Sequence, residues 1–284
     1  MYTKLEYSDF LNEVCNNFEK TLDCDLKLYK GISSKEELFD YYYVDPAKTI
    51  RQSKTSKENG NFYNLLLNNL PKWNSICKRE NSVICTTKLE TAKIYGQASS
   101  GKGLIFGKTY VVLPKMGSLV AIAPTHDIWY SFQKALGGFG LRGSNNSLVK
   151  FNLCITEIFK SLKLSDWSNM NWNDFKTTIE KISRKELISS EKISIEAQVF
   201  LSTIIAKQED VLGFMDSSFE PAQNGIVVKD YNEFLKYSDY LNNEIWTESP
   251  CLLIEINKYK LLGKSINVKE RFLGIYRRIR AYKR

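Results

Sequence analysis

Histidine is nearly absent from this sequence, since His126 is the only one in 284 residues. Most acid–base, metal-binding and catalytic-triad chemistries use at least one imidazole. His126 lies in Pro124-Thr125-His126-Asp127, a context that favours the start of a helix. The chemistry of this chain must therefore depend mainly on carboxylates, hydroxyls and cationic side chains.

Paired cysteines and long apolar runs are lacking as well. The six cysteines have no Cys-x-x-Cys spacing, which excludes the usual zinc and disulfide-framework patterns. We therefore expect reduced thiols, several of them buried, and no metal site. No stretch approaches the roughly 20 apolar residues of a membrane helix, and the N-terminus does not read as a secretion signal. We expect a cytoplasmic protein with no membrane partner.

What the sequence does contain is enough apolar residues for a sizeable core and an excess of positive charge. It is 43% apolar and 13% aromatic, which suffices to fold one or two domains. The net charge is +8 and the isoelectric point is near 9.0. Two interpretations stay open: the charge favours an anionic partner such as nucleic acid, or it only keeps the protein in solution.

Hydrophobic periodicity and capping signals predict helices interspersed with strands. Helices are expected at 9–22, from Ser33 to before Asp45-Pro46, at 62–70 and at 91–95, and the stretch 150–210 reads as predominantly helical. Strands are expected at 26–29, 82–86, 109–113, 118–123, 225–228 and 251–256, with the third and fourth forming a hairpin. This order indicates an α+β fold and not a regular βαβ alternation.

The segment Gly96-Gln97-Ala98-Ser99-Ser100-Gly101-Lys102-Gly103 nearly spells a phosphate-binding P-loop. Gly103 stands where that motif needs a serine or threonine, and the segment follows a predicted helix when it should follow a strand. We therefore expect a loop and no nucleoside-triphosphate site.

Four separate segments form a more specific pattern. They are Leu28-Tyr29-Lys30-Gly31-Ile32, Arg51-Gln52-Ser53, Arg79-Glu80-Asn81-Ser82-Val83-Ile84-Cys85-Thr86-Thr87 and Trp246-Thr247-Glu248-Ser249-Pro250-Cys251-Leu252-Leu253-Ile254. In order and spacing they resemble the arginine, serine and glutamate strands of the ADP-ribosyltransferase superfamily. There, a first strand ends in Tyr-Arg-Gly, a middle strand ends in hydroxyl residues before a helix, and a catalytic glutamate leads a late strand. The stretch from Pro71-Lys72-Trp73 to Tyr95-Gly96 is also similar to bacteriophage and antiphage proteins of this type.

The resemblance implies a fold and a reaction. The fold is α+β, with split mixed β-sheets and helices in a single domain over 1–284, and a helical insertion around 150–210. The reaction cleaves the nicotinamide–ribose bond of NAD⁺, which is a substrate, and transfers ADP-ribose without a metal. A carboxylate is needed beside the ribose because positive charge develops on the sugar.

The resemblance also implies roles for individual residues. Glu248 is the first candidate for the catalytic carboxylate and Glu244 the second. The cofactor-binding set consists of Lys30, Gly31, Arg51, Ser53, Arg79, Ser82, Thr86 and Thr87. In this set the cations neutralise the pyrophosphate and the hydroxyls position the nicotinamide-side ribose.

The sequence departs from the family pattern in two places, one that concerns phosphate binding and one that concerns the acceptor. Lys30 replaces the arginine, which keeps the charge but loses the bidentate grip on phosphate. Glu244 and Glu248 are four residues apart, unlike the Glu-x-Glu or Gln-x-Glu pair typical of arginine- or asparagine-directed members. We therefore expect a nucleic-acid acceptor, RNA first, as in a phage-defence toxin restrained by an antitoxin or other inhibitory protein. The alternatives are a protein-directed transferase of phage origin, an NAD glycohydrolase and a non-catalytic nucleic-acid-binding protein.

Overall fold

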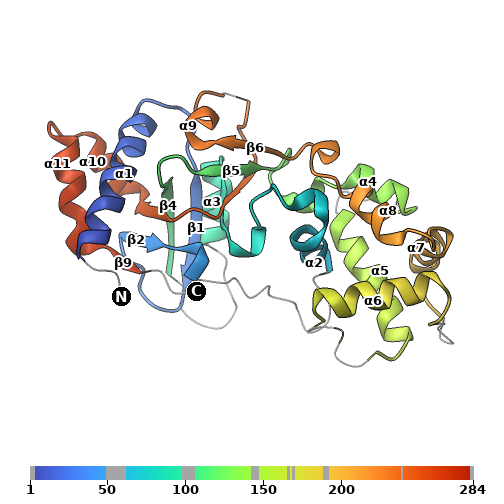
Figure 1. Ribbon diagram of the computed structural model, residues 1–284. Coiled ribbons are helices and arrows are strands. Elements are labelled where there is room, and N and C mark those ends of the chain that lie inside the picture. Colours follow the sequence, from blue (N-terminus) through green and yellow to red (C-terminus); the bar gives the residue numbers. More distant parts are fainter. Residues whose placement is uncertain are drawn as a thin grey trace. The chain divides into compact units, whose positions relative to one another are not determined.

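The computed structural model describes residues 4–48, 62–97, 106–141, 147–164, 167, 170–187, 192–237 and 239–281. The chain divides into two compact units, each built from separate stretches of sequence (Figure 1). The first unit, or sheet unit, comprises 1–51, 81–122 and 228–284. The second, or helical unit, comprises 52–80 and 123–227. The protein is thus a mixed α+β protein, as the order of predicted elements indicated.

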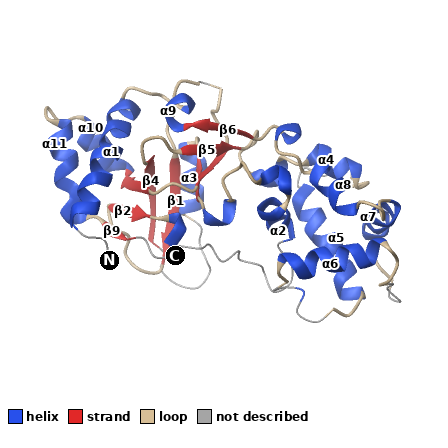
Figure 2. Cartoon of the chain, viewed as in Figure 1, coloured by secondary structure: helices blue, strands red, loops and turns tan. Residues whose placement is uncertain are grey.

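The described strands form one open sheet in the order β6-β5-β7-β3-β1-β4-β8-β2-β9. Strands are drawn in red in Figure 2. The strands are β1 (Tyr29–Ser34), β2 (Tyr41–Val44), β3 (Val83–Thr86), β4 (Phe106–Pro114), β5 (Leu119–Ile122), β6 (Val227–Asp230), β7 (Glu244–Thr247), β8 (Cys251–Glu255) and β9 (Arg280–Ala281). The recorded pairings are antiparallel except for β2 with β9, which is parallel.

The sheet is continuous, but the junction in its middle is narrow. Strands β1 and β4 pair over six residues, from Tyr29 with Val111 to Ser34 with Phe106. Strands β1 and β3 pair only at Tyr29 with Thr86. The sequence predicted split sheets, and the structure has one sheet whose two halves meet at this single residue pair.

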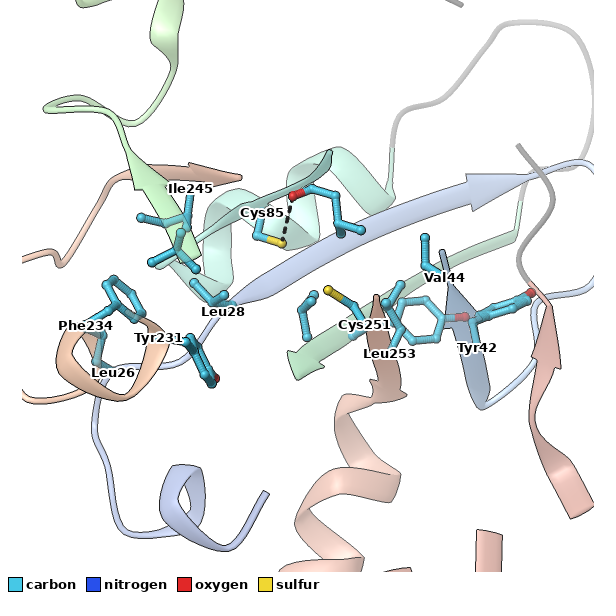
Figure 3. Close-up of a cluster of buried hydrophobic side chains, with 14 of the residues drawn as sticks. Leu26, Leu28, Tyr42, Val44, Cys85, Tyr231, Phe234, Ile245, Cys251 and Leu253 are labelled. Carbon is cyan, nitrogen blue, oxygen red and sulfur yellow. Dashed lines mark hydrogen bonds between the residues drawn. The ribbon is translucent and has the colours of Figure 1, made fainter. Parts of the chain in front are cut away.

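Each face of the sheet has its own apolar core, because side chains alternate between faces along every strand. On one face α1 (Lys4–Leu22), α10 (Ile256–Gly263) and α11 (Val268–Leu273) bury residues such as Phe18 and Phe272 against the strands. On the other face α9 (Tyr231–Phe234) contributes Tyr231 and Phe234 to a cluster with Cys85 and Cys251 (Figure 3). We call these the α1 face and the α9 face.

Helix α3 (Leu89–Gly96) packs unusually close to β1 and β4 through glycines. A Cβ atom built on Gly31 would lie 1.9 Å from the carbonyl oxygen of Ala92, and one built on Gly107 would lie 2.0 Å from the carbonyl oxygen of Gly96. Real Cβ atoms do not approach backbone atoms this closely. Gly31 is therefore needed where the helix backbone touches the strand.

The helical unit has an aromatic core. Its helices are α2 (Phe62–Asn69), α4 (Gln133–Gly138), α5 (Ser147–Ser161), α6 (Trp172–Ser183), α7 (Ile195–Ala206) and α8 (Val211–Ser218). Phe139, Phe151 and Phe200 have ring centroids within 6.1 Å of one another. Among the described residues, the stretch 150–210 is predominantly helical, as predicted. Its status as an insertion stays a prediction.

Two local predictions were wrong. The helix expected from Ser33 is absent, because β1 continues to Ser34 and the Ser34 hydroxyl accepts a hydrogen bond from the Glu36 backbone in a turn. The hairpin expected between β4 and β5 does not form either. The chain turns at Gly117, which has φ +72°, but β5 then pairs with β7, and three strands separate it from β4.

Candidate functional site

Two of the three strands singled out by sequence, β1 and β3, lie side by side, but the predicted glutamate strand, β8, lies between β4 and β2. The strand on the other side of β3 is β7, which the sequence did not predict as a strand. Strand β3 is flanked by β1 and β7, so positions near 30, 86 and 244 meet although they are far apart in the chain. Thr86 pairs with Tyr29 on one side and with Glu244 on the other. Directly paired residues project from the same face of a sheet. Tyr29, Thr86 and Glu244 therefore form a row at the narrow junction.

The hydrogen-bond pattern brings Thr86 and Glu244 especially close. The Ile84 carbonyl points towards β1, because it accepts a hydrogen bond from the Lys30 side chain. Three residues later, the Thr87 backbone N–H points the other way and donates to the Asn243 carbonyl at the start of β7. Groups alternate in direction along a strand, so Thr86 and Glu244 are a non-hydrogen-bonded pair. In such pairs the Cα atoms are about 4.5 Å apart, closer than in the alternate pairs.

Two further hydrogen bonds fix the start of β7. The Thr87 backbone N–H donates to the Asn243 carbonyl at 3.1 Å, and the Asn243 backbone N–H donates to the Thr87 hydroxyl at 2.9 Å. Glu244 is the first residue of β7, and its exposed fraction is 6%. A buried carboxylate is thereby held at the strand start beside the Thr86 hydroxyl.

Lys30 bridges the junction. Its ammonium donates to the carbonyl of Ile84 at 2.9 Å, at the point where β1 has separated from β3. Lys30 is also close enough to lower the pKa of the Cys251 thiol, although burial dominates and raises that pKa well above its usual value. Lys30 thus places a cation one residue along β1 from Tyr29.

Gly31 and Tyr29 contact helix α3. Gly31 permits the close approach described above, so its role in the structure is packing. Burial raises the pKa of the Tyr29 phenol, and the charge of Glu90 in the first turn of α3 raises it further. Tyr29 lies within the first of the four sequence segments, but no role was predicted for it. Its pairing with Thr86 could not be read from the local sequence.

Glu248 lies away from the row of Tyr29, Thr86 and Glu244. It is exposed, in the turn between β7 and β8, and lies four residues from Glu244, which corresponds to about 13 Å along a strand. The strand that follows Glu248 is β8, which pairs with β4 and β2 and not with β3. The glutamate that leads a strand next to the hydroxyl strand is Glu244.

The remaining expected residues are distributed differently. Ser82 is fully buried immediately before β3. Arg79 belongs to the helical unit, where its guanidinium donates to the Tyr63 hydroxyl at 3.2 Å. Arg51 and Ser53 lie outside the described residues, as does most of the P-loop-like segment.

The part of the chain that the structure describes contains no group of three or more histidine, cysteine or acidic residues that could hold a metal ion. All six cysteines are free thiols and five are buried, as expected. Over the same residues, no helix has the length and apolar character needed to cross a membrane.

Comparison with known proteins returned no matching family model, no matching curated protein and no matching solved structure.

Proposed function

We propose that this protein is an NAD-dependent ADP-ribosyltransferase whose catalytic carboxylate is Glu244. The observation that carries the proposal is the row formed by Tyr29, Thr86 and Glu244. The resemblance implied a lysine-bearing strand, a hydroxyl strand and a strand led by a glutamate, with Glu248 the first candidate and Glu244 the second. In the sheet, β1, β3 and β7 are adjacent, and β7 begins with Glu244. Nothing in the local sequence required that adjacency.

The chemistry of the row fits the reaction. Breaking the bond between the ribose C1′ and the nicotinamide nitrogen sends the electron pair to nicotinamide and leaves positive charge on the sugar. A fixed carboxylate stabilises this charge more in the transition state than in bound NAD⁺. Glu244 supplies the carboxylate, and the Thr86 hydroxyl positions the ribose. An acceptor nucleophile then attacks C1′ and loses its proton.

Lys30 has a narrower role than the family arginine. Its ammonium already caps the Ile84 carbonyl, so it can give a phosphate charge but not a bidentate grip. Its side chain also projects from the sheet face opposite Tyr29, Thr86 and Glu244, because neighbouring residues of a strand alternate in direction. We propose that Lys30 adds only long-range electrostatic attraction for the pyrophosphate. Arg51, which lies outside the described residues, is the candidate for the direct contact.

If Glu244 is the catalytic glutamate, the first position of the family's Glu-x-Glu or Gln-x-Glu pair is Asn242, which is exposed. Asn242-x-Glu244 has an amide side chain at that position, as Gln-x-Glu does. The pair Glu244 and Glu248, four residues apart, does not match either form. The positive charge still favours a nucleic-acid acceptor, with RNA the first choice and a toxin role in phage defence as the setting.

The test compares Glu244→Gln with Glu248→Gln in the presence of labelled NAD⁺ and separate pools of RNA, DNA and protein. Both changes remove one negative charge with little change of shape, and the two positions are four residues apart. We expect Glu244→Gln to lose on the order of 10²-fold or more in transfer, the scale for one electrostatic stabiliser. Glu248→Gln should retain wild-type activity.

The same experiment separates the alternatives. Label in protein alone would favour a protein-directed transferase, and free ADP-ribose without label transfer would favour an NAD glycohydrolase. A non-catalytic nucleic-acid-binding protein would consume no NAD⁺ and would not be stabilised by it. An NAD-binding enzyme should gain about 2.7 kcal/mol of unfolding free energy at 100 times its Kd. Equal activity of both glutamate variants would refute the assignment to Glu244.

A further inference from the structure

The positive charge of this protein is concentrated in one segment. Residues 256–284 contain ten lysines and arginines and one acidic residue, Glu270, for a net charge of +9. The whole chain carries +8, so the other 255 residues together carry −1. The basic character is therefore a local feature of the C-terminal segment and not a general property of the surface.

The described part of this segment surrounds a cavity in the sheet unit. Helix α10, helix α11 and the 3₁₀ turn η7 (Gly274–Arg278) line a cavity of about 820 Å³, and Tyr41 of β2 contributes to its wall. Four of the lining side chains are cationic: Lys258, Lys264, Arg271 and Arg278. Ligand sites typically measure 300–1,000 Å³. We call this the C-terminal basic cavity.

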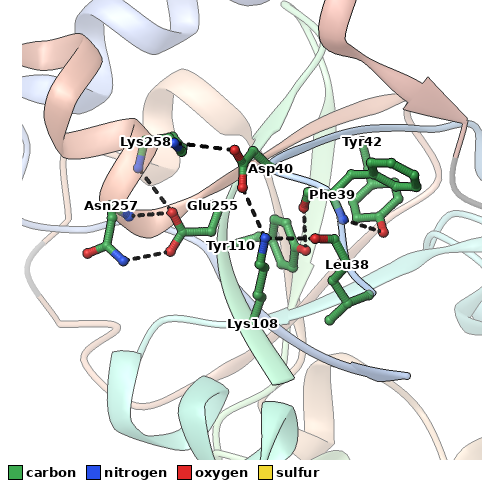
Figure 4. A network of polar contacts seen from close by, with 9 residues as sticks. All are labelled: Leu38, Phe39, Asp40, Tyr42, Lys108, Tyr110, Glu255, Asn257 and Lys258. Atoms are coloured by element: carbon green, nitrogen blue, oxygen red, sulfur yellow. Dashed lines mark hydrogen bonds and ion pairs between the residues drawn. The ribbon is translucent and has the colours of Figure 1, made fainter. Parts of the chain in front are cut away.

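Acidic groups near the cavity only partly offset its charge. Glu270 lines it and is held by the side chain of Asn267, which caps α11. Asp40 lies 3.4 Å from the Lys258 ammonium and 3.0 Å from that of Lys108 (Figure 4). Lys258 is thus engaged, and Lys264, Arg271 and Arg278, all exposed, remain as the cations placed to meet an incoming anion.

Solvent-exposed apolar side chains also line the cavity. Leu261 has an exposed fraction of 57% and Ile266 is fully exposed, and both line the cavity. Cations combined with apolar side chains in a concave site suit a nucleotide, whose phosphate is anionic and whose base offers flat apolar faces.

We infer that the C-terminal basic cavity docks single-stranded nucleic acid, with one unpaired nucleotide inside the cavity and its neighbours over the basic surface. This inference rests on the proposed function for its catalytic meaning, because the docked strand would be the acceptor. A duplex keeps its bases stacked and offers only its backbone, so it cannot fill the cavity. An anionic membrane is a poorer fit, because α10 has eight residues and α11 has six, and the apolar side chains line a hollow instead of forming a helix-long stripe.

The sheet connects the cavity to the catalytic row. One line of paired residues runs from Glu244 through Thr86, Tyr29, Val111 and Ile254 to Tyr41. It crosses five interstrand steps of about 4.8 Å, or about 24 Å in all. A strand docked in the cavity must cover at least that distance to reach Glu244.

The test measures binding of a fluorescent single-stranded RNA of about 20 nucleotides by anisotropy, without NAD⁺, over a range of salt. The double variant Lys264→Glu/Arg271→Glu is compared with Lys176→Glu/Lys181→Glu, which makes the same charge change at exposed positions on α6 in the helical unit. We expect the cavity variant to bind at least tenfold more weakly at low salt. Loss of two phosphate contacts should reduce the slope of log affinity against log salt by about 1.4.

Equal affinities of the two double variants would overturn the inference, as would equal wild-type affinity for a duplex of the same sequence. Cavity-dependent binding to vesicles of anionic lipid, with RNA binding unchanged, would also overturn it. Glu244→Gln should bind RNA as the wild type does. If RNA binds in a cavity-dependent way but no ADP-ribose is transferred, the docking site is supported and the proposed function is refuted. The two proposals can therefore be tested independently.

Discussion

Replacing Gly31 with alanine should destabilise the sheet unit through a single added methyl group. The new Cβ would lie 1.9 Å from the Ala92 carbonyl oxygen and 2.4 Å from the Gly96 nitrogen, whereas ordinary contacts begin at 3.4 Å. Both neighbours are backbone atoms of α3, so relief requires a shift of about 1.5 Å between helix and strand. Overpacking of this kind costs about 1–3 kcal/mol, and more where backbone must move.

The assay is thermal unfolding followed by circular dichroism. For a unit of this size each kcal/mol lowers Tm by roughly 2–4 °C, so a loss of 3 kcal/mol corresponds to a fall of about 6–12 °C. Gly274→Ala is the matched control, because its Cβ would meet nothing within 4 Å and its φ is −68°. If Gly31→Ala melts within a degree of the wild type, the argument that α3 sits on the strand through this glycine is wrong.

Three other changes test separate parts of the structure. Thr87→Val leaves the buried Asn243 N–H without its hydroxyl acceptor, so unfolding free energy should fall by about 1–3 kcal/mol and transfer should fall with it, while Thr87→Ser should restore both. Partial burial alone raises the pKa of Asp40, but Lys108 and Lys258 outweigh it and hold that pKa below its usual value. The stabilisation is therefore present above about pH 4 and lost as pH falls, so a Tm deficit of Asp40→Asn at pH 7 should shrink in acid. Tyr231→Phe removes a buried hydroxyl for which the described structure shows no hydrogen-bond partner, and its unfolding free energy should be unchanged or up to about 1 kcal/mol higher.

The sequence predicted most of the regular elements because they carry local signals. The apolar periodicity of α1 and the β-branched run of β3 are examples, and the structure contains both. The helix expected from Ser33 failed because a capping signal is local, whereas the pairing of β1 with β4 involves residues about 75 positions away. The hairpin failed for the same reason.

The candidate site was predictable in part. The motif located Thr86, Thr87 and Lys30, which the structure places at the junction of β1, β3 and β7. The choice between Glu244 and Glu248 depended on which of two consecutive strands pairs with β3. Glu244 begins one short strand and Glu248 precedes the next, so the local patterns are similar, and only the strand pairing distinguishes them.

The narrow junction has a consequence for how the sheet opens. Backbone hydrogen bonds join β1 to β4 along six residue pairs, but a single pair joins β1 to β3. Few interstrand hydrogen bonds protect the backbone amides at this junction. Their hydrogen exchange should therefore occur by local opening, with a lower opening free energy than that of amides in β4 or β8. Since Thr86 belongs to that pair, a rise in protection at Thr86 and Tyr29 on addition of NAD⁺ would report directly on occupancy of the catalytic row.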